Sequence, residues 1–146
     1  MLSNKEILCP NNLLKIAKNK GPVKAVIVNA GKKVAILSTK QAVEANLIIP
    51  VFIGDKPLIE SIAKEINWDI SKYEIIHETV ENNTAPLAAK LASEGKVKII
   101  VKGHIHTDVL MKAVLKRNLN LIGKKRLSHI WHMTLQNDDK PFIITD

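Results

Sequence analysis

The feature that most constrains this fold is the alternation of short apolar runs with segments of helical period. The runs are rich in β-branched residues, as buried strands are, and cover residues 23–29, 48–54, 73–78 and 96–103. Between or after them, apolar side chains recur every three or four positions in 34–45, 55–66, 84–95 and 107–118. Strands that are continuously apolar and separated by helices predict a mostly parallel sheet covered on both faces. We therefore expect an α/β fold, a three-layer α/β/α sandwich.

Local signals mark several element ends. A short helix is expected around residues 13–17, with Asn11 or Asn12 as its cap. Asp55 is expected to cap the helix that follows the second strand, because Pro57 suits a first helical turn. Two further strand-like segments, 127–135 and 141–146, are joined by the polar turn QNDDK. The chain reads as one domain, residues 1–146, without a linker or an internal repeat.

Composition is typical of a globular protein, with 46% apolar and 25% charged residues. No apolar run is long enough to span a bilayer, and the N-terminus has no apolar block of signal-peptide length. A single cysteine, Cys9, excludes an internal disulfide and fits a reducing compartment. We therefore expect a cytoplasmic protein without a membrane partner. Nothing near Cys9 in the sequence would activate it as a nucleophile.

The net charge of +8 does not by itself indicate a nucleic-acid partner. Only two basic residues are arginines, the lysines are scattered, and aromatic residues make up only 3% of the chain. Nucleic-acid binders more often cluster their basic residues and use arginine for recognition. We expect no nucleic-acid partner, although a basic nucleic-acid-associated domain remains the least favoured alternative. Solvated surface lysines are the favoured interpretation, and an anionic small-molecule partner is compatible with it.

The segment VKGHIHTDVLMKAV, residues 101–114, concentrates polar groups where a strand turns into a helix. In a parallel sheet, ligands bind beyond the carboxyl ends of the strands, and a helix N-terminus there favours an anion. Lys102 supplies positive charge, Gly103 permits close approach of a ligand, and the Thr107 hydroxyl can cap the helix or contact a phosphate. Asp108 would repel an anion unless it points away. The alternatives are an anion site and a well-capped turn without a ligand.

Other site chemistries are weakly supported. His104 with His106, and His129 with His132, supply four imidazoles, but residues three apart in a strand point to opposite faces. We therefore expect no metal site, and we interpret His132 and Trp131 as packing residues. Ser128 and His129 are adjacent in a strand and cannot form a catalytic pair. The sequence contains neither GxGxxG nor GxxxxGK[ST].

Taken in order, VKGHIHTDVLMKAV (101–114), RLSHIWHM (126–133) and PFIITD (141–146) resemble the N-terminal half of the phosphate acetyl/butyryltransferases. AVEANLIIPVFIGDKPLI (42–59) is similar to the family's early helix, strand and Gly-Asp turn. The butyryltransferase-like branch is expected to be the nearer one. The resemblance implies an isocitrate/isopropylmalate dehydrogenase-like fold that is incomplete at the C-terminus. It also makes residues 1–146 the N-terminal part of a longer two-domain acyltransferase.

The same resemblance implies transfer of an acyl group between coenzyme A and inorganic phosphate, with coenzyme A as a substrate and no other cofactor. The residues that match the family's substrate- and phosphate-binding loop and its next strand are Lys102, Gly103, His106, Thr107, Arg126 and Ser128. The segment after the early strand, NAGKKVAIL, departs from the polar turn of the family. We assign no catalytic residue here, because the family's principal catalytic residues lie in its second half.

Two further interpretations follow from the resemblance. The chain is expected to be inactive as an isolated half, and the alternative is a non-catalytic α/β module that binds phosphate or coenzyme A, or pairs with a separately encoded second half. Apolar surface that relatives bury is expected to be exposed, which favours a homodimer or a larger species.

Overall fold

The computed structural model describes residues 10–123, 127–135 and 138–146. Its elements follow the order α1 (Asn11–Asn19), β1 (Val23–Val28), α2 (Lys33–Glu44), β2 (Ile48–Gly54), α3 (Lys56–Glu65), β3 (Glu74–His77), α4 (Glu81–Ser93), β4 (Ile99–Lys102), α5 (Thr107–Val114), a 3-10 turn (Arg117–Leu119), β5 (Ile130–Leu135) and β6 (Asp138–Thr145). Within the described residues, no helix is long and apolar enough to cross a membrane.

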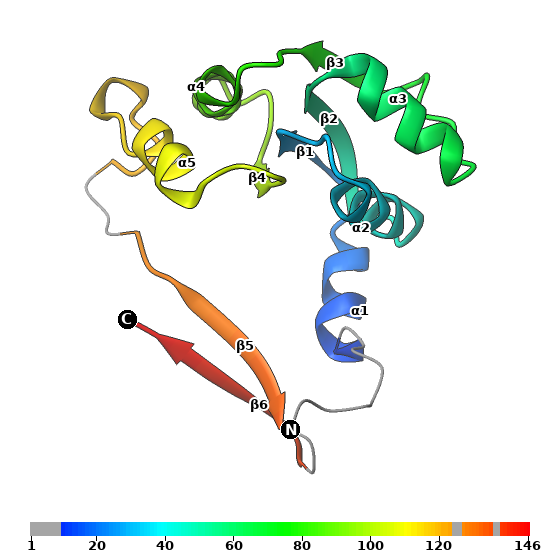
Figure 1. The fold of residues 1–146 in the computed structure, drawn as a ribbon. Helices are drawn as coiled ribbons and strands as arrows, with labels where there is room; N and C mark the ends of the chain where they lie inside the picture. The colour runs from blue at the N-terminus through cyan, green and yellow to red at the C-terminus, as the bar shows by residue number, and fades with distance from the viewer. Residues whose placement is uncertain (1–9, 124–126, 136–137) are drawn as a thin grey trace.

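Four strands form a parallel sheet in the order β3-β2-β1-β4. The two central strands are almost fully buried, whereas the edge strands β3 and β4 are only partly so. The expectation that every strand is buried was therefore wrong for the edges, where only one neighbouring strand gives cover. The prediction of a mostly parallel α/β fold is confirmed (Figure 1).

The sheet separates two apolar clusters. Val26, Val28, Val51 and Ile53 point to one face and pack with α4 and α5. Ile27 and Phe52 point to the other face, where α2 and α3 cover them. Because successive strand residues alternate between faces, one apolar run feeds both clusters. This arrangement is the three-layer α/β/α sandwich (Figure 1).

The structure confirms the predicted cap of α3, whereas the predicted cap of α1 and the predicted ends of α4 and α5 were wrong. Asp55 caps α3, accepting a hydrogen bond from the Leu58 N–H at 3.3 Å. The cap of α1 is Pro10 rather than Asn11 or Asn12, which are helical. The helix α4 begins three residues before its expected start at residue 84, and α5 ends at Val114 rather than 118.

The last two strands do not join the parallel sheet. The strands β5 and β6 pair antiparallel with each other and form a separate two-stranded ribbon. We call residues 127–135 and 138–146 the arm; Figure 1 shows it extending away from the sheet and its helices. Residues 136–137 of the predicted turn QNDDK lie outside the described residues, and Asp138 already belongs to β6. Trp131, predicted to pack, is 56% exposed.

Candidate functional site

The carboxyl ends of β1 and β4 are neighbours at the C-terminal end of the parallel sheet. Val28 pairs with Lys102 as the last residue in register, so the segments that follow both strands start side by side. The loop after β4 is then fixed by two backbone hydrogen bonds, from Gly103 N–H to Val28 O at 2.9 Å and from His104 N–H to Asn29 O at 3.0 Å. We call residues 102–107, which connect β4 to α5, the junction. As predicted, the junction lies at the carboxyl ends of the strands, where ligands bind in such folds.

Gly103 is required by the sheet itself. A Cβ at this position would lie 2.4 Å from Val28 O and 2.8 Å from Asn29 O, distances at which side-chain atoms do not fit. The glycine therefore allows β4 to continue alongside the end of β1. Its predicted role in the approach of a ligand stays a prediction.

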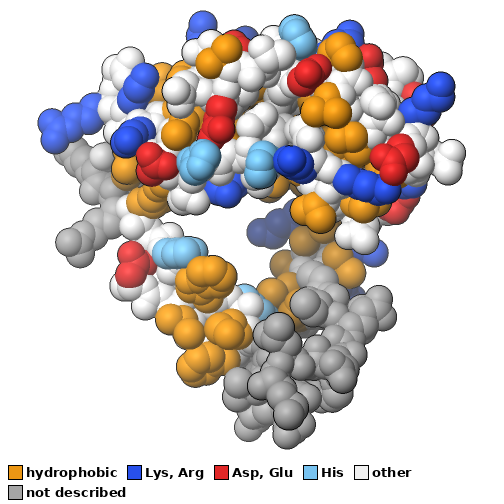
Figure 2. Space-filling view, in the orientation of Figure 1, with side chains coloured by type: hydrophobic (Ala, Val, Ile, Leu, Met, Phe, Trp, Pro, Cys, Tyr) orange, Lys and Arg blue, Asp and Glu red, His pale blue; other side chains and the backbone are white. Residues whose placement is uncertain are grey.

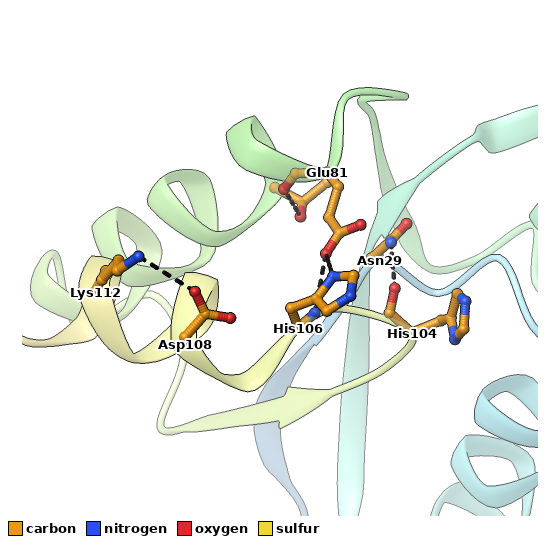
Figure 3. A network of polar contacts seen from close by, with 7 residues as sticks. Asn29, Glu81, His104, His106, Asp108 and Lys112 are labelled. Atoms are coloured by element: carbon orange, nitrogen blue, oxygen red, sulfur yellow. Dashed lines mark hydrogen bonds and ion pairs between the residues drawn. The ribbon is translucent and has the colours of Figure 1, made fainter.

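Asn29 also holds this loop through its side chain. Its backbone has a φ of 53°, in the left-handed region that asparagine tolerates. Its side-chain Nδ2 donates a hydrogen bond to His104 O (Figure 3). The sequence interpretation missed Asn29, although its position directly after a buried strand parallel to β4 was a usable signal.

Glu81, the first residue of α4, reaches the start of α5. Its Oε1 lies 2.9 Å from the His106 backbone nitrogen, which donates to it, and 2.7 Å from His106 Nδ1 (Figure 3). The backbone hydrogen bond from His106, with the imidazole contact next, lowers the pKa of Glu81. The hydrogen bond and charge of Glu81 raise the pKa of His106. Sequence analysis missed Glu81 because it placed the start of this helix three residues too late.

His106, not Thr107, occupies the N-cap position of α5, and its side chain does not cap the helix. Thr107 is the first helical residue, and its hydroxyl makes no hydrogen bond within the part of the chain that the structure describes. The capping alternative proposed for Thr107 is thus not observed. Asp108 is directed along the helix to Lys112, with Oδ2 and Nζ 3.2 Å apart, and points away from the junction as expected (Figure 3).

These groups surround an open depression of about 310 Å³, lined by Glu81, Lys102, His104, Ile105, His106 and Thr107. The exposed Lys102 ammonium makes no hydrogen bond or ion pair with any described residue. An ammonium, an imidazole of raised pKa and a hydroxyl that has no hydrogen-bond partner among the described residues can together bind an anion, while Glu81 balances part of the charge.

The structure does not bring all predicted residues together. Lys102, Gly103, His106 and Thr107 meet at the junction. Ser128 precedes β5 in the arm and does not line the depression. Arg126 lies outside the described residues. Among the described residues, no group of three histidine, cysteine, aspartate or glutamate side chains could hold a metal ion.

Fold and junction together define a parallel α/β domain whose loop between β4 and α5 carries the Lys102 ammonium, the His106 imidazole and the Thr107 hydroxyl. No family model matches the chain. It is 38% identical over 135 residues to a phosphate acetyltransferase of Rickettsia typhi, covering 92% of this chain and 39% of that protein. It is 32% identical over 126 residues to a phosphate butyryltransferase of Clostridium beijerinckii, covering 86% and 42%.

Two solved structures have a similar fold. A branched-chain phosphotransacylase from Enterococcus faecalis superposes with a TM-score of 0.63 at 26% identity, covering 84% of this chain and 42% of that one. A phosphotransacetylase from Staphylococcus aureus shares the fold, with a TM-score of 0.66 at 21% identity, covering 90% and 49%.

The chain is therefore homologous to part of the phosphate acetyl- and butyryltransferases, as the sequence motifs predicted. It spans about two fifths of the length of the curated relatives it matches. The identity is higher to the Rickettsia typhi acetyltransferase than to the butyryltransferase, so a nearer butyryltransferase branch is not supported. The dehydrogenase-like comparison stays a prediction.

Proposed function

We propose that this chain forms a phosphate- and coenzyme A-facing part of a phosphate acyltransferase. The observation that carries the proposal is a group of hydrogen-bond donors at the carboxyl end of β4: the Lys102 ammonium, the His106 imidazole and the Thr107 hydroxyl. The names of the relatives add the reaction class, transfer of an acetyl or butyryl group to or from phosphate. Acyl-CoA with phosphate, or acyl phosphate with coenzyme A, are the corresponding substrate pairs.

In this reaction the thiol sulfur of coenzyme A attacks the acyl phosphate carbonyl. A carbon–sulfur bond forms, the carbon–oxygen bond to phosphate breaks, the phosphate leaves with the bonding electron pair, and the thiol proton passes to the leaving phosphate or to water. Cations placed beside the leaving phosphate stabilise the charge that develops on it. Lys102 supplies such a charge directly. Glu81 favours the protonated, cationic form of His106, because it raises the pKa of that imidazole.

The Thr107 hydroxyl would orient a phosphate oxygen, since it has no competing hydrogen bond among the described residues. We propose that Arg126 and Ser128 complete the substrate contacts of this part. Coenzyme A is a substrate in this scheme, and no other cofactor or metal is assigned to these residues. We place the reaction in the cytoplasm, where the single cysteine fits the reducing environment.

We expect binding without turnover from this chain alone, because the principal catalytic groups belong to the family's other half. The experiment combines two measurements on the purified chain in low-salt buffer. Thermal unfolding is followed against phosphate and coenzyme A, and release of coenzyme A is assayed from acetyl- or butyryl-CoA plus phosphate.

A melting temperature that rises with millimolar phosphate, without acyl transfer, supports the proposal. A melting temperature that is independent of both ligands contradicts it and favours a strand-to-helix turn without a ligand. Acyl transfer at ordinary enzyme rates would contradict the expectation that this chain is inactive by itself.

A further inference from the structure

A second cavity opens between helix α2 and the edge strand β4, with a volume of about 310 Å³. Helix α2 packs against β2 and α3 but makes few contacts with β4, so part of the sheet face beside β4 lies open. We call this cavity the α2–β4 groove. Its floor and wall consist of Ile27, Ile48 and Val101 from the sheet and Ala35, Ser38 and Ala42 from α2.

The interior of the α2–β4 groove offers an apolar surface. Ile27 and Val101 are partners in register on neighbouring strands, so their side chains project to the same face of the sheet. The α2 residues on the other side are small, which leaves room between the helix and the sheet. Thr39 also lines the groove, but its hydroxyl already donates a hydrogen bond to Ala35 O at 2.7 Å. A saturated carbon chain therefore fits this interior better than a polar group does.

The mouth of the α2–β4 groove is positively charged. Lys32 directly precedes α2 and Lys102 ends β4, so both residues lie at the carboxyl ends of the strands. The groove lining also includes His104 but no acidic residue. Figure 2 shows histidine and lysine side chains beside one another along the lower edge of the α/β part, with hydrophobic side chains among them. A ligand with an anionic head and an apolar chain matches both the charge of the mouth and the apolar interior.

The α2–β4 groove adjoins the depression at the junction. Lys102 and His104 line both cavities. In Figure 3 the His104 imidazole points away from Glu81 and His106, which lie on the other side of the loop. A phosphate bound beside Lys102 at the junction therefore lies at the mouth of the groove, and a carbon chain attached to that phosphate can enter it.

We propose that the α2–β4 groove binds the carbon chain of the acyl substrate while the phosphate of the same molecule lies at the junction. This inference rests on the proposed function and adds the place of the acyl chain. Helix α2 rises about 10 Å between Ala35 and Ala42, whereas a four-carbon chain with bonds of about 1.5 Å spans less than about 5 Å. A butyryl chain thus reaches about as far as Ser38, and longer or branched chains also fit.

The test uses the purified chain and alkylphosphonates, stable compounds in which a phosphonate replaces the phosphate and an alkyl chain replaces the acyl chain. Calorimetric titration in low-salt buffer measures the dissociation constants of inorganic phosphate, methylphosphonate and butylphosphonate. Each fully buried methylene strengthens binding about fourfold, so three would give about 60-fold. Because the groove is open to solvent on one side, we expect butylphosphonate to bind at least about tenfold more tightly than methylphosphonate.

The variant Ser38→Leu fills the middle of the groove. Ser38 is exposed and its side chain makes no hydrogen bond within the described residues, so the native fold should persist, which thermal unfolding checks. Gln41→Leu is the matched control, because it places the same side chain at an exposed position of α2 outside the groove lining. We expect Ser38→Leu to remove the advantage of butylphosphonate over methylphosphonate and to leave methylphosphonate binding unchanged. Gln41→Leu should keep the native advantage.

A second readout locates the chain directly. Butylphosphonate, unlike methylphosphonate, should shift the NMR methyl signals of Val101 and Ala35, which line the groove. The methyl signals of Val97 are the control, because Val97 belongs to the apolar cluster on the opposite face of the sheet.

Equal affinities for methylphosphonate and butylphosphonate in the native chain overturn the inference, as does an advantage of butylphosphonate that Ser38→Leu leaves intact. Val101 signals that depend on protein concentration and not on butylphosphonate would indicate a second copy in the groove and would also overturn it.

The two proposals fail in different ways. Binding of inorganic phosphate and methylphosphonate without an effect of chain length overturns this inference and leaves the proposed function standing. Butylphosphonate that binds the native chain but not Ser38→Leu, when inorganic phosphate does not bind, supports the groove and contradicts the phosphate site. If none of these anions binds, both proposals are overturned.

Discussion

Glu81 and His106, 25 residues apart in the sequence, form a two-point contact that joins the first turns of α4 and α5. The Glu81 Oε1 accepts the His106 backbone N–H at 2.9 Å and lies 2.7 Å from its imidazole Nδ1. One carboxylate therefore satisfies a backbone donor at the start of α5 and fixes the orientation of the imidazole beside Lys102. It also raises the pKa of His106 and so favours the protonated, cationic imidazole that the proposed phosphate contact uses.

Replacing Glu81 should change the titration of His106. The hydrogen bond and charge of Glu81 raise the His106 pKa above its ordinary 6.5. In Glu81→Gln we therefore expect this pKa to fall toward 6.5, measured by NMR titration of the imidazole signals. Glu60→Gln is the control, because Glu60 is exposed and does not contact His106. It should leave the His106 titration as it is in the native chain. An unchanged titration in Glu81→Gln would show that the contact does not persist in solution.

The same contact predicts a pH window for stability. Because the folded-state pKa of His106 is raised, its contribution is fully present below pH 6.5 and is lost as pH rises through the raised value. Because the folded-state pKa of Glu81 is lowered, its contribution is present above pH 4.5 and is lost as pH falls through the lowered value. Urea unfolding should show the largest difference between native chain and Glu81→Gln between these two pH values. A difference independent of pH would contradict this.

Lys102→Ala should weaken phosphate binding and barely change stability, because Lys102 is exposed and supplies charge rather than packing. The weakening should shrink as salt is added, since salt screens an exposed charge. Lys98→Ala is the matched control, because Lys98 is equally charged and exposed but precedes β4 at its opposite end. Calorimetric titration of phosphate at low and high salt distinguishes the variants. Equal losses of phosphate affinity in Lys102→Ala and Lys98→Ala would show that phosphate responds to the net charge of the chain and not to a site at Lys102.

Thr107→Val should weaken phosphate binding by on the order of 1 kcal/mol, the usual value of one hydrogen bond. Its free energy of unfolding should change little, because the hydroxyl makes no hydrogen bond within the described residues. Thr107→Ser restores the hydroxyl and should restore binding. Phosphate titration and urea unfolding of both variants check this. A large stability loss in Thr107→Val would instead indicate that the hydroxyl supports the helix.

Gly103→Ala should destabilise the fold by about 1–3 kcal/mol, because the added Cβ meets two backbone carbonyl oxygens that cannot move independently of β1. Gly31→Ala is the control, since its added Cβ meets only a flexible Leu58 side chain at 3.2 Å. Denaturant unfolding of both variants gives the comparison. Equal, small losses would mean that the ends of β1 and β4 separate easily.

The sequence determined the layered fold and the location of the junction. Its apolar runs and helical periods are local, short-range properties, and they correctly predicted the order of strands and helices through α5. The position of residues 102–107 at a strand end followed from the same pattern. The ordered motifs also indicated the relationship to phosphate acyltransferases, which the comparisons confirmed.

Only the tertiary structure decided which groups meet at that junction. Asn29 and Glu81 are distant from His104 and His106 in the sequence, and they reach them because β1 lies beside β4 and α4 beside α5. The arm shows the same limit. Strand propensity predicted two strands from residue 127 onward, but propensity does not encode a pairing partner. Pairing depends on contacts between segments, and here it placed β5 and β6 together, outside the parallel sheet.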